Sequence, residues 1–151
     1  MAIDEQTIKE LESRVGVEGQ PLVYEIEKGL IRRFAVAVGD DNPLWQDEEY
    51  AAKSRYGGIV APPNLILTLG FGGLLKKYID DPAVTVLHGS TELECHRPVR
   101  AGDTISAVSR VKNVRQRQGE AGTMLFVTFD IAYSNQKNEK VAECRQMVII
   151  Y

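Results

Sequence analysis

The sequence predicts an α+β domain in which a curved antiparallel sheet wraps around a central apolar helix. Two observations predict this class. Residues 65–75 are apolar on every side until Lys76, and a helix of that kind must be surrounded by protein. From residue 84 to the C-terminus the hydrophobic period changes to that of strands, with turn residues between them. A helix enclosed by antiparallel strands satisfies both patterns.

The N-terminal part of the chain is expected to hold two helices on either side of a short strand. Residues 4–14 predict an amphipathic helix, and residues 22–26 predict a strand after the Gly-Gln-Pro break. Residues 28–38 predict the second helix, which Gly39 is placed to end. The predicted buried faces are Ile8, Leu11 and Val15 in the first helix, and Ile31, Phe34, Ala35 and Val38 in the second.

The central segment should contain a short helical stretch and then the apolar helix. Residues 48–55 predict one or two helical turns before a Gly-Gly break. Pro62, Pro63 and Asn64 then open the apolar helix, because proline suits a helix start, where the missing N–H would have no partner anyway. The glycines within this helix allow close packing against the sheet.

Five strands are predicted in the C-terminal half, over residues 84–88, 91–97, 104–117, 124–135 and 140–151. The fourth alternates cleanly, so one face should be buried. That face consists of Leu125, Val127, Phe129, Ile131 and Tyr133. A single curved sheet leaves its edges uncovered, so we expect two such domains to pair side by side.

The composition excludes several classes of protein. The 151 residues carry 18 basic and 21 acidic side chains, a net charge of −3, and no block of like charge suits nucleic acid or a membrane surface. We expect one domain over residues 1–151, with residues 1–18 as a helical extension. The N-terminus lacks the apolar core of a signal peptide and no run reaches membrane-spanning length, which predicts a cytoplasmic protein.

Cysteine and histidine usage argues against redox and metal chemistry. Cys95 and Cys144 lie in predicted strands without CxxC spacing, so we expect buried small hydrophobic residues. Because His88 and His96 are the only histidines, no metal-ligand cluster and no bound metal are expected. His96 alternates with Leu93 and Cys95 and should face away from them, as a structural histidine or as a replacement base.

Residues 39–50, GDDNPLWQDEEY, are the most informative stretch. By themselves Asp40 and the Asn-Pro pair are ordinary turn residues. Followed by AAKSRYGGIVAPP and later by HRPVRAGD, the stretch resembles the MaoC-like dehydratases, which include R-specific enoyl-CoA hydratases. The likeness covers roughly residues 20–151 and is greatest to the N-terminal-type, substrate-binding hot-dog domains of heterodimeric hydroxyacyl dehydratases. It implies a hot-dog fold and an acyl-CoA or acyl-ACP substrate, with no separate cofactor.

The sequence departs from that family at two points. Active members read Gly-Asp-x-Asn-Pro-Leu-His, in which Asp and His activate the water that adds to an enoyl thioester. Here Asp40 keeps the Asp position and Trp45 replaces the His, and an indole N–H is only a donor. Active members also read Ile-Val-His-Gly-Met, where a backbone N–H polarises the thioester carbonyl. This chain has Pro62 instead of the glycine, and proline has no N–H.

The resemblance marks one candidate catalytic residue, Asp40, which the turn explains equally well. The candidate substrate-binding residues are Asn42, Trp45, Tyr56, Gly58, Pro63 and Asn64. Trp45 either fills the vacated active-site space or forms a wall of an acyl channel. Arg97, Arg100 and Lys112 are either scattered surface cations or contacts for the phosphates of coenzyme A or phosphopantetheine.

Three functional hypotheses follow. The first is a subunit of a two-component enoyl-CoA or enoyl-ACP hydratase, a hydro-lyase, that is silent alone and shapes the acyl tunnel beside a hot-dog partner with an intact Asp and His. The second is a self-sufficient homodimeric hydratase or acyl-CoA thioesterase that uses Asp40. The third is a non-enzymatic acyl-thioester binding protein.

Overall fold

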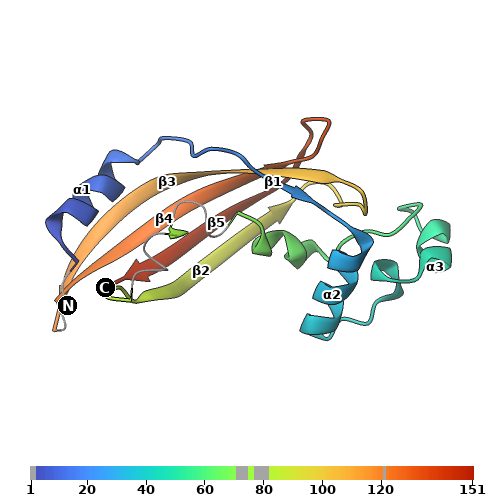
Figure 1. Cartoon of the computed structure of the whole chain (residues 1–151), viewed down its shortest axis with the longest axis horizontal. Coiled ribbons are helices and arrows are strands. Elements are labelled where there is room, and N and C mark those ends of the chain that lie inside the picture. The colour runs from blue at the N-terminus through green and yellow to red at the C-terminus, as the bar shows by residue number, and fades with distance from the viewer. Residues whose placement is uncertain (1–2, 71–74, 77–81, 121) are drawn as a thin grey trace.

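A computed structural model describes residues 3–70, 75–76, 82–120 and 122–151. Its main feature is one five-stranded antiparallel sheet with the strand order β1-β3-β4-β5-β2. The long strands curve along their length (Figure 1), which confirms the predicted α+β class with a curved antiparallel sheet. The strands are β1 (Leu22–Glu25), β2 (Val86–Cys95), β3 (Thr104–Gly119), β4 (Gly122–Ser134) and β5 (Lys140–Ile150).

The strands predicted over residues 84–88 and 91–97 are in fact one strand, β2, and this part of the prediction is wrong. Both halves of β2 pair with β5, and the register shifts between His88 and Ser90. The intervening Gly89 therefore belongs to a bulge, which keeps the strand direction, and not to a turn. A side chain at Gly89 would crowd Met147 of β5.

The inner face of the sheet is the hydrophobic core. The alternation predicted for β4 is confirmed, since its five inward residues from Leu125 to Tyr133 are each at most 1% exposed. Cys144, Val148 and Ile150 of β5 are buried as well. The same core includes Leu65, Ile66, Leu69 and Leu75 from the predicted apolar helix. Sheet and central segment thus bury each other.

The central segment differs from the continuous helix predicted over residues 65–75. A 3-10 helix, η2 (Pro63–Thr68), ends where Leu69 is extended and Gly70 has a left-handed backbone with φ of 79°. Residues 71–74, which the predicted helix includes, lie outside the described part of the chain, as do residues 77–81. Glycine tolerates positive φ at little cost, which is why the helix can stop at this point inside the core.

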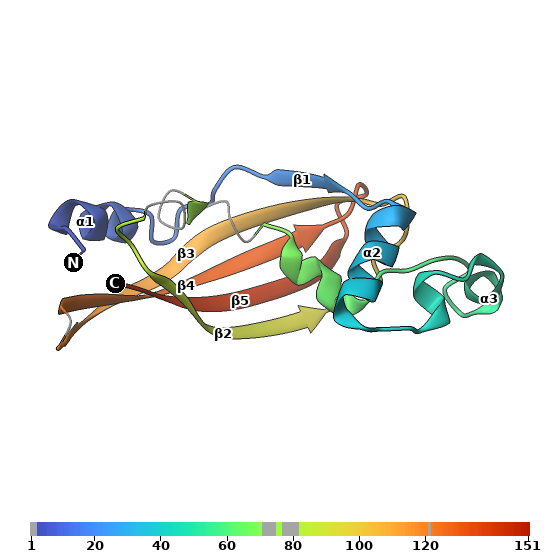
Figure 2. The same ribbon diagram turned by 60° about the horizontal axis from the view of Figure 1, so that its bottom comes forward.

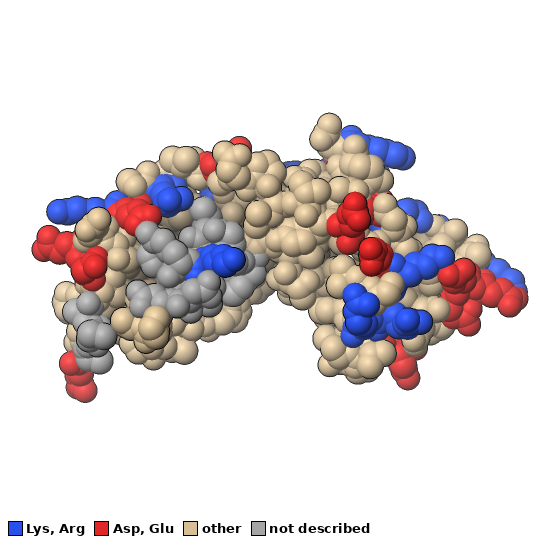
Figure 3. Space-filling model, viewed as in Figure 1, with Lys and Arg blue, Asp and Glu red and all other residues tan. Residues whose placement is uncertain are grey.

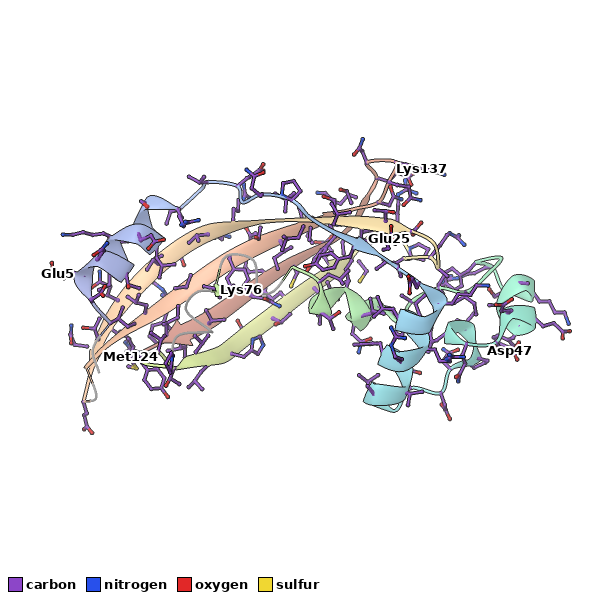
Figure 4. The ribbon with its side chains drawn as sticks, viewed as in Figure 1. Glu5, Glu25, Asp47, Lys76, Met124 and Lys137 are labelled. Carbon is purple, nitrogen blue, oxygen red and sulfur yellow. The ribbon has the colours of Figure 1, made fainter. Side chains whose placement is uncertain are left out.

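The remaining helices lie at opposite ends of the sheet (Figures 1 and 2). Helix α1 (Glu5–Ser13) covers the end near both termini, whereas α2 (Lys28–Val38) and α3 (Glu48–Lys53) lie together beyond the other end. Lys28 Nζ and Glu48 Oε1, 2.6 Å apart, connect α2 with α3. Asp47, labelled in Figure 4, caps α3 by accepting a 2.9 Å hydrogen bond from the Tyr50 N–H.

Two predicted helix faces extend too far. Ile31 and Ala35 of α2 are buried, but Val38 is 49% exposed, because α2 ends there and Gly39 turns the chain away. In α1 the predicted third member, Val15, is 43% exposed, since the helix ends two residues earlier. The last residue of each apolar series therefore lies outside the core.

Acidic and basic side chains are interspersed on the face shown in Figure 3. This distribution agrees with the small net charge and gives no extended surface of one sign on that face. Among the described residues, no helix combines the length and apolar character that crossing a membrane requires.

Candidate functional site

A cavity of about 370 Å3 lies where the end of β2, the start of η2 and the loop after α2 meet. Its wall is mostly apolar and includes Val60, Pro62, Leu65, Ile66 and Leu69. Cavities of this size and character are typical of small-molecule sites. The cavity is therefore the candidate functional site.

The loop after α2 places one aromatic ring at this cavity through a short series of hydrogen bonds. Asp40 Oδ1 accepts from the Asn42 N–H at 3.1 Å, and Asn42 Oδ1 accepts from the Leu44 N–H at 3.0 Å. The N–H of Trp45 donates to the Asn42 carbonyl oxygen at 3.1 Å, within the 3-10 turn η1 (Pro43–Trp45). The Asp and Asn side chains thus hold the loop that positions the indole.

Trp45 itself lies in the cavity wall and is 9% exposed. Its indole N–H has no hydrogen-bond acceptor among the described residues. An unpaired buried donor of this kind costs about 1–3 kcal/mol. Position 45, to which the resemblance assigns the catalytic His of active members, thus holds an indole, which can donate a hydrogen bond but accept no proton.

The backbone at the start of η2 offers few hydrogen-bond donors. The Ala61 N–H donates to the Val99 carbonyl oxygen at 2.8 Å, and the two prolines that follow have no N–H. Three consecutive residues on the cavity wall, 61–63, thus have no free backbone donor. The oxyanion site expected at this point of an active hydratase is not formed by them.

Two arginines lie at the cavity beside Tyr56. The Arg55 guanidinium stacks 4.8 Å from the centre of the Tyr56 ring and donates to its hydroxyl at 2.7 Å. Arg97 also lines the cavity, and its Nη1 lies 3.8 Å from Glu139 Oε1. Arg100 instead donates to the Tyr56 carbonyl oxygen from outside the cavity wall. The pair Arg55 and Arg97 is therefore the positive charge available to a ligand at this wall.

The structure brings only part of the predicted site together. Trp45, Tyr56 and Pro63 line the cavity. Asp40, Asn42, Gly58 and Asn64 are not part of its wall, and neither is Lys112 on β3. Asp40 and Asn42 act on the cavity through the loop that carries the indole.

The predicted site does not include Cys95, the last residue of β2, although Cys95 lines the cavity. His96, the next residue, which the sequence offers as a structural histidine or a replacement base, lines the cavity as well. The expectation that Cys95 is buried is wrong, since its side chain is exposed, whereas Cys144 is buried as predicted. Burial raises the pKa of the Cys144 thiol to about 11, with a smaller contribution from Asp130. His88 is exposed and contacts the Thr91 hydroxyl at 3.0 Å.

His96 lies between two carboxylates. Its Nε2 is 3.1 Å from Glu143 Oε2, and its Nδ1 is 3.9 Å from Glu94 Oε1. The prediction that no metal-ligand cluster can form is geometrically wrong, because these three side chains offer atoms within 4.8 Å of one another. Glu143 is already engaged, since a hydrogen bond from Lys140, and then one from His96, lowers its pKa.

Comparison with known proteins supports the family resemblance. A model of the FAS1-like dehydratase domain region matches residues 13–144. A UPF0336 protein of Parafrankia sp. is 36% identical over 125 residues, which is 80% of each chain. The UPF0336 protein of Saccharopolyspora erythraea is 29% identical over 144 residues, covering 91% of this chain and 89% of that protein.

Solved structures share the fold. The (R)-hydratase from A. caviae has a TM-score of 0.72 at 22% identity and covers 89% of this chain and 94% of its own. The ChsH1-ChsH2 complex from Mycobacterium tuberculosis has a TM-score of 0.72 at 22% identity, with coverage of 96% and 89%. The HadBC (3R-hydroxyacyl-ACP dehydratase) complex of the same organism has a TM-score of 0.72 at 24% identity, with coverage of 90% and 98%.

Since the family model matches residues 13–144, which is most of the chain, the chain belongs to the FAS1-like dehydratase domain region family.

Proposed function

We propose that this protein is the substrate-binding subunit of a two-component enoyl-thioester hydratase or 3-hydroxyacyl dehydratase. It binds the acyl group in the 370 Å3 cavity, while a partner hot-dog subunit supplies the Asp and His that activate water. The observation that carries the proposal is Trp45, an aromatic wall at the position where active members hold the catalytic His. Compared with active members, this chain would thus retain a substrate cavity without the catalytic base.

The chemistry of the cavity wall supports binding without turnover. Hydration needs a group that takes a proton from water and a donor that stabilises the developing oxyanion. Trp45 cannot accept a proton, and residues 61–63 have no free N–H. Removing one oxyanion donor alone typically slows an enzyme about a hundredfold or more. The remaining apolar wall suits an acyl chain.

The edge of the sheet supports a hot-dog partner. Strand β2 is an edge strand in the order β1-β3-β4-β5-β2, and the unpaired backbone groups of an edge strand are a template for pairing. Its C-terminal residue, Cys95, lies at the cavity. A partner strand beside β2 would therefore bring its own side chains close to the bound acyl group. A chain with this fold is found in the ChsH1-ChsH2 complex and in the HadBC complex.

The arginines at the cavity fit the rest of such a substrate. Coenzyme A and phosphopantetheine both carry phosphate next to the thioester-bearing arm, and guanidinium groups bind phosphate through paired hydrogen bonds. Arg55 is held by Tyr56 and Arg97 lies beside Glu139. We assign the phosphate contact to these two side chains, in place of Arg100 and Lys112.

The direct test is reconstitution. The purified chain is assayed for hydration of crotonyl-CoA alone and together with a co-purifying hot-dog subunit that has an intact Asp and His. We expect no hydration by the chain alone, and turnover by the complex that needs the partner's His but survives Asp40→Asn in this chain. Hydration by the single chain at the rate of the complex would overturn the proposal.

One observation favours a second candidate, a self-sufficient homodimeric hydratase or thioesterase. His96 lies at the cavity with Glu143 at 3.1 Å, and a carboxylate can orient an imidazole for general-base catalysis. In that case the chain alone hydrates or hydrolyses acyl-CoA, and His96→Ala or Asp40→Asn abolishes the activity. Wild-type turnover in both variants would exclude this candidate.

A further inference from the structure

Trp45 borders two cavities at once. Trp45 lines the apolar cavity of about 370 Å3, and it also lines a smaller cavity of about 170 Å3. The smaller cavity is polar, with Lys28 and Arg32 from α2 and Glu48 from α3 on its wall. Consecutive residues divide in the same way, since Ile59 lines the smaller cavity and Val60 the larger. Trp45 is thus the residue that the two linings have in common.

Hydrogen bonds fix the turn that carries Trp45. The η1 turn that carries Trp45 is fixed by the Asn42 side chain at the Leu44 N–H, and the Leu44 carbonyl oxygen accepts from the Val60 N–H at 3.5 Å. Trp45 is 9% exposed. A side chain supported by its own turn and by the neighbouring segment has little freedom to move when a ligand enters the larger cavity.

Stability alone does not explain an indole at this position. Its N–H is buried without an acceptor among the described residues, whereas a buried Trp normally finds a partner for that group. A phenyl or isobutyl side chain would fill apolar space without burying an unpaired donor. What the indole adds is length and width, the properties that a wall requires.

We infer that Trp45 is the end wall of the acyl cavity and limits the length of acyl group that this protein accepts. The inference rests on the proposed acyl binding and deepens it. Shortening Trp45 would connect the two cavities, adding the smaller cavity and the volume of the indole itself. Acyl chains too long for the wild-type cavity would then extend past position 45 toward Lys28 and Arg32.

The test is a binding profile over saturated thioesters that cannot be hydrated. Titration calorimetry with butanoyl-, octanoyl-, dodecanoyl- and hexadecanoyl-CoA is performed on the full-length wild type, Trp45→Phe and Trp45→Ala. Wild-type affinity should rise about fourfold for each methylene group buried and stop rising when the chain reaches the indole. In Trp45→Ala the rise should continue, with a gain of about tenfold or more for the longest chain and little change for butanoyl-CoA.

The matched control is Tyr50→Ala, which removes an aromatic ring from the same region. Tyr50 is 52% exposed and lines neither cavity, so its profile should follow the wild type. If Trp45→Ala does not fold, Trp45→Leu and Trp45→Phe carry the test, since both keep an apolar side chain in the core.

The outcomes separate the two claims. An unchanged profile in the Trp45 variants, or an equal loss of affinity at every chain length, would overturn the end wall while acyl binding stands. Absence of binding by the wild type at every chain length would overturn both the proposed function and the wall.

Discussion

The hydroxyl of Tyr133, on β4, donates a 2.8 Å hydrogen bond to the carbonyl oxygen of Leu69, where η2 ends. At the next residue, the Gly70 N–H donates to the hydroxyl of Tyr24 on β1 at 2.9 Å. Tyr133 thus satisfies a carbonyl group of the kind that a helix C-terminus leaves unpaired, and Tyr24 satisfies the N–H of the residue at which the chain turns away. Burial raises the pKa of Tyr133, so its hydroxyl remains a donor under ordinary conditions.

We expect Tyr133→Phe to lower the free energy of unfolding by about 1–3 kcal/mol, because the Leu69 carbonyl oxygen is left unpaired in the core. Urea denaturation measures the change. Tyr24→Phe is the matched variant. Tyr24 is only partly buried, so water can reach the Gly70 N–H more easily and the loss should be smaller. A larger loss in Tyr24→Phe than in Tyr133→Phe would contradict this assignment.

Gly70→Ala should destabilise the protein more than Gly57→Ala does. Both glycines have positive φ, 79° and 69°, so each alanine variant carries a similar backbone strain of about 1–2 kcal/mol. A Cβ at Gly70 would also lie 3.0 Å from the Cβ of Ala107, whereas one at Gly57 meets open space. The difference between their melting temperatures isolates the packing effect, and equal losses would show that β3 moves aside.

Alkaline pH should weaken the fold through Cys144. Burial raises the pKa of the Cys144 thiol from its usual 9.0 to about 11 in the folded chain, so this contribution to stability is complete below about pH 9 and is lost as the pH rises through 11. Urea midpoints are compared at about pH 8 and about pH 11 in the wild type and Cys144→Ala. The variant should lose less stability between the two values, since other groups titrate equally in both. Parallel losses would contradict the prediction.

Cys95 should report whether the 370 Å3 cavity is occupied. It is exposed and lines the cavity, whereas Cys144 is buried, so iodoacetamide should modify Cys95 first. Mass spectrometry then follows the modification with and without octanoyl-CoA, and free coenzyme A serves as the control. Partial desolvation raises the pKa of Cys95, so the reaction is performed at mildly alkaline pH. We expect octanoyl-CoA to slow the modification of Cys95 and free coenzyme A to slow it less. Equal protection by the two ligands would contradict an acyl contact and indicate a contact with the coenzyme A part only.

The sequence predicted the elements whose determinants are local. The bounds of α2 and the buried face of β4 follow from the spacing of apolar residues and from Gly39, all within about a dozen positions. The helix over 65–75 failed for the opposite reason. Its end at Gly70 depends on hydroxyls 46 and 64 residues away in the chain, and no local pattern contains them.

The candidate site was predictable only where the resemblance was specific. Trp45, Tyr56 and Pro63 of the quoted motifs line the cavity, whereas Asp40, Asn42 and Gly58 of the same motifs do not. His96 was placed by strand alternation, yet β2 ends one residue earlier and the alternation does not extend to it. Its partner Glu143 is 47 residues away. The assignment of roles to these residues stays a prediction.

Trp45 is the only tryptophan in the chain, and it lies in the wall of the candidate site. The intrinsic ultraviolet fluorescence of this protein therefore originates almost entirely from one ring beside one cavity, with the tyrosines as a separable background. A ligand that enters the cavity would change the surroundings of this indole, and no second indole would mask the change. The unlabelled protein thus contains its own optical reporter, with which mixtures of natural thioesters can be searched for the one it retains.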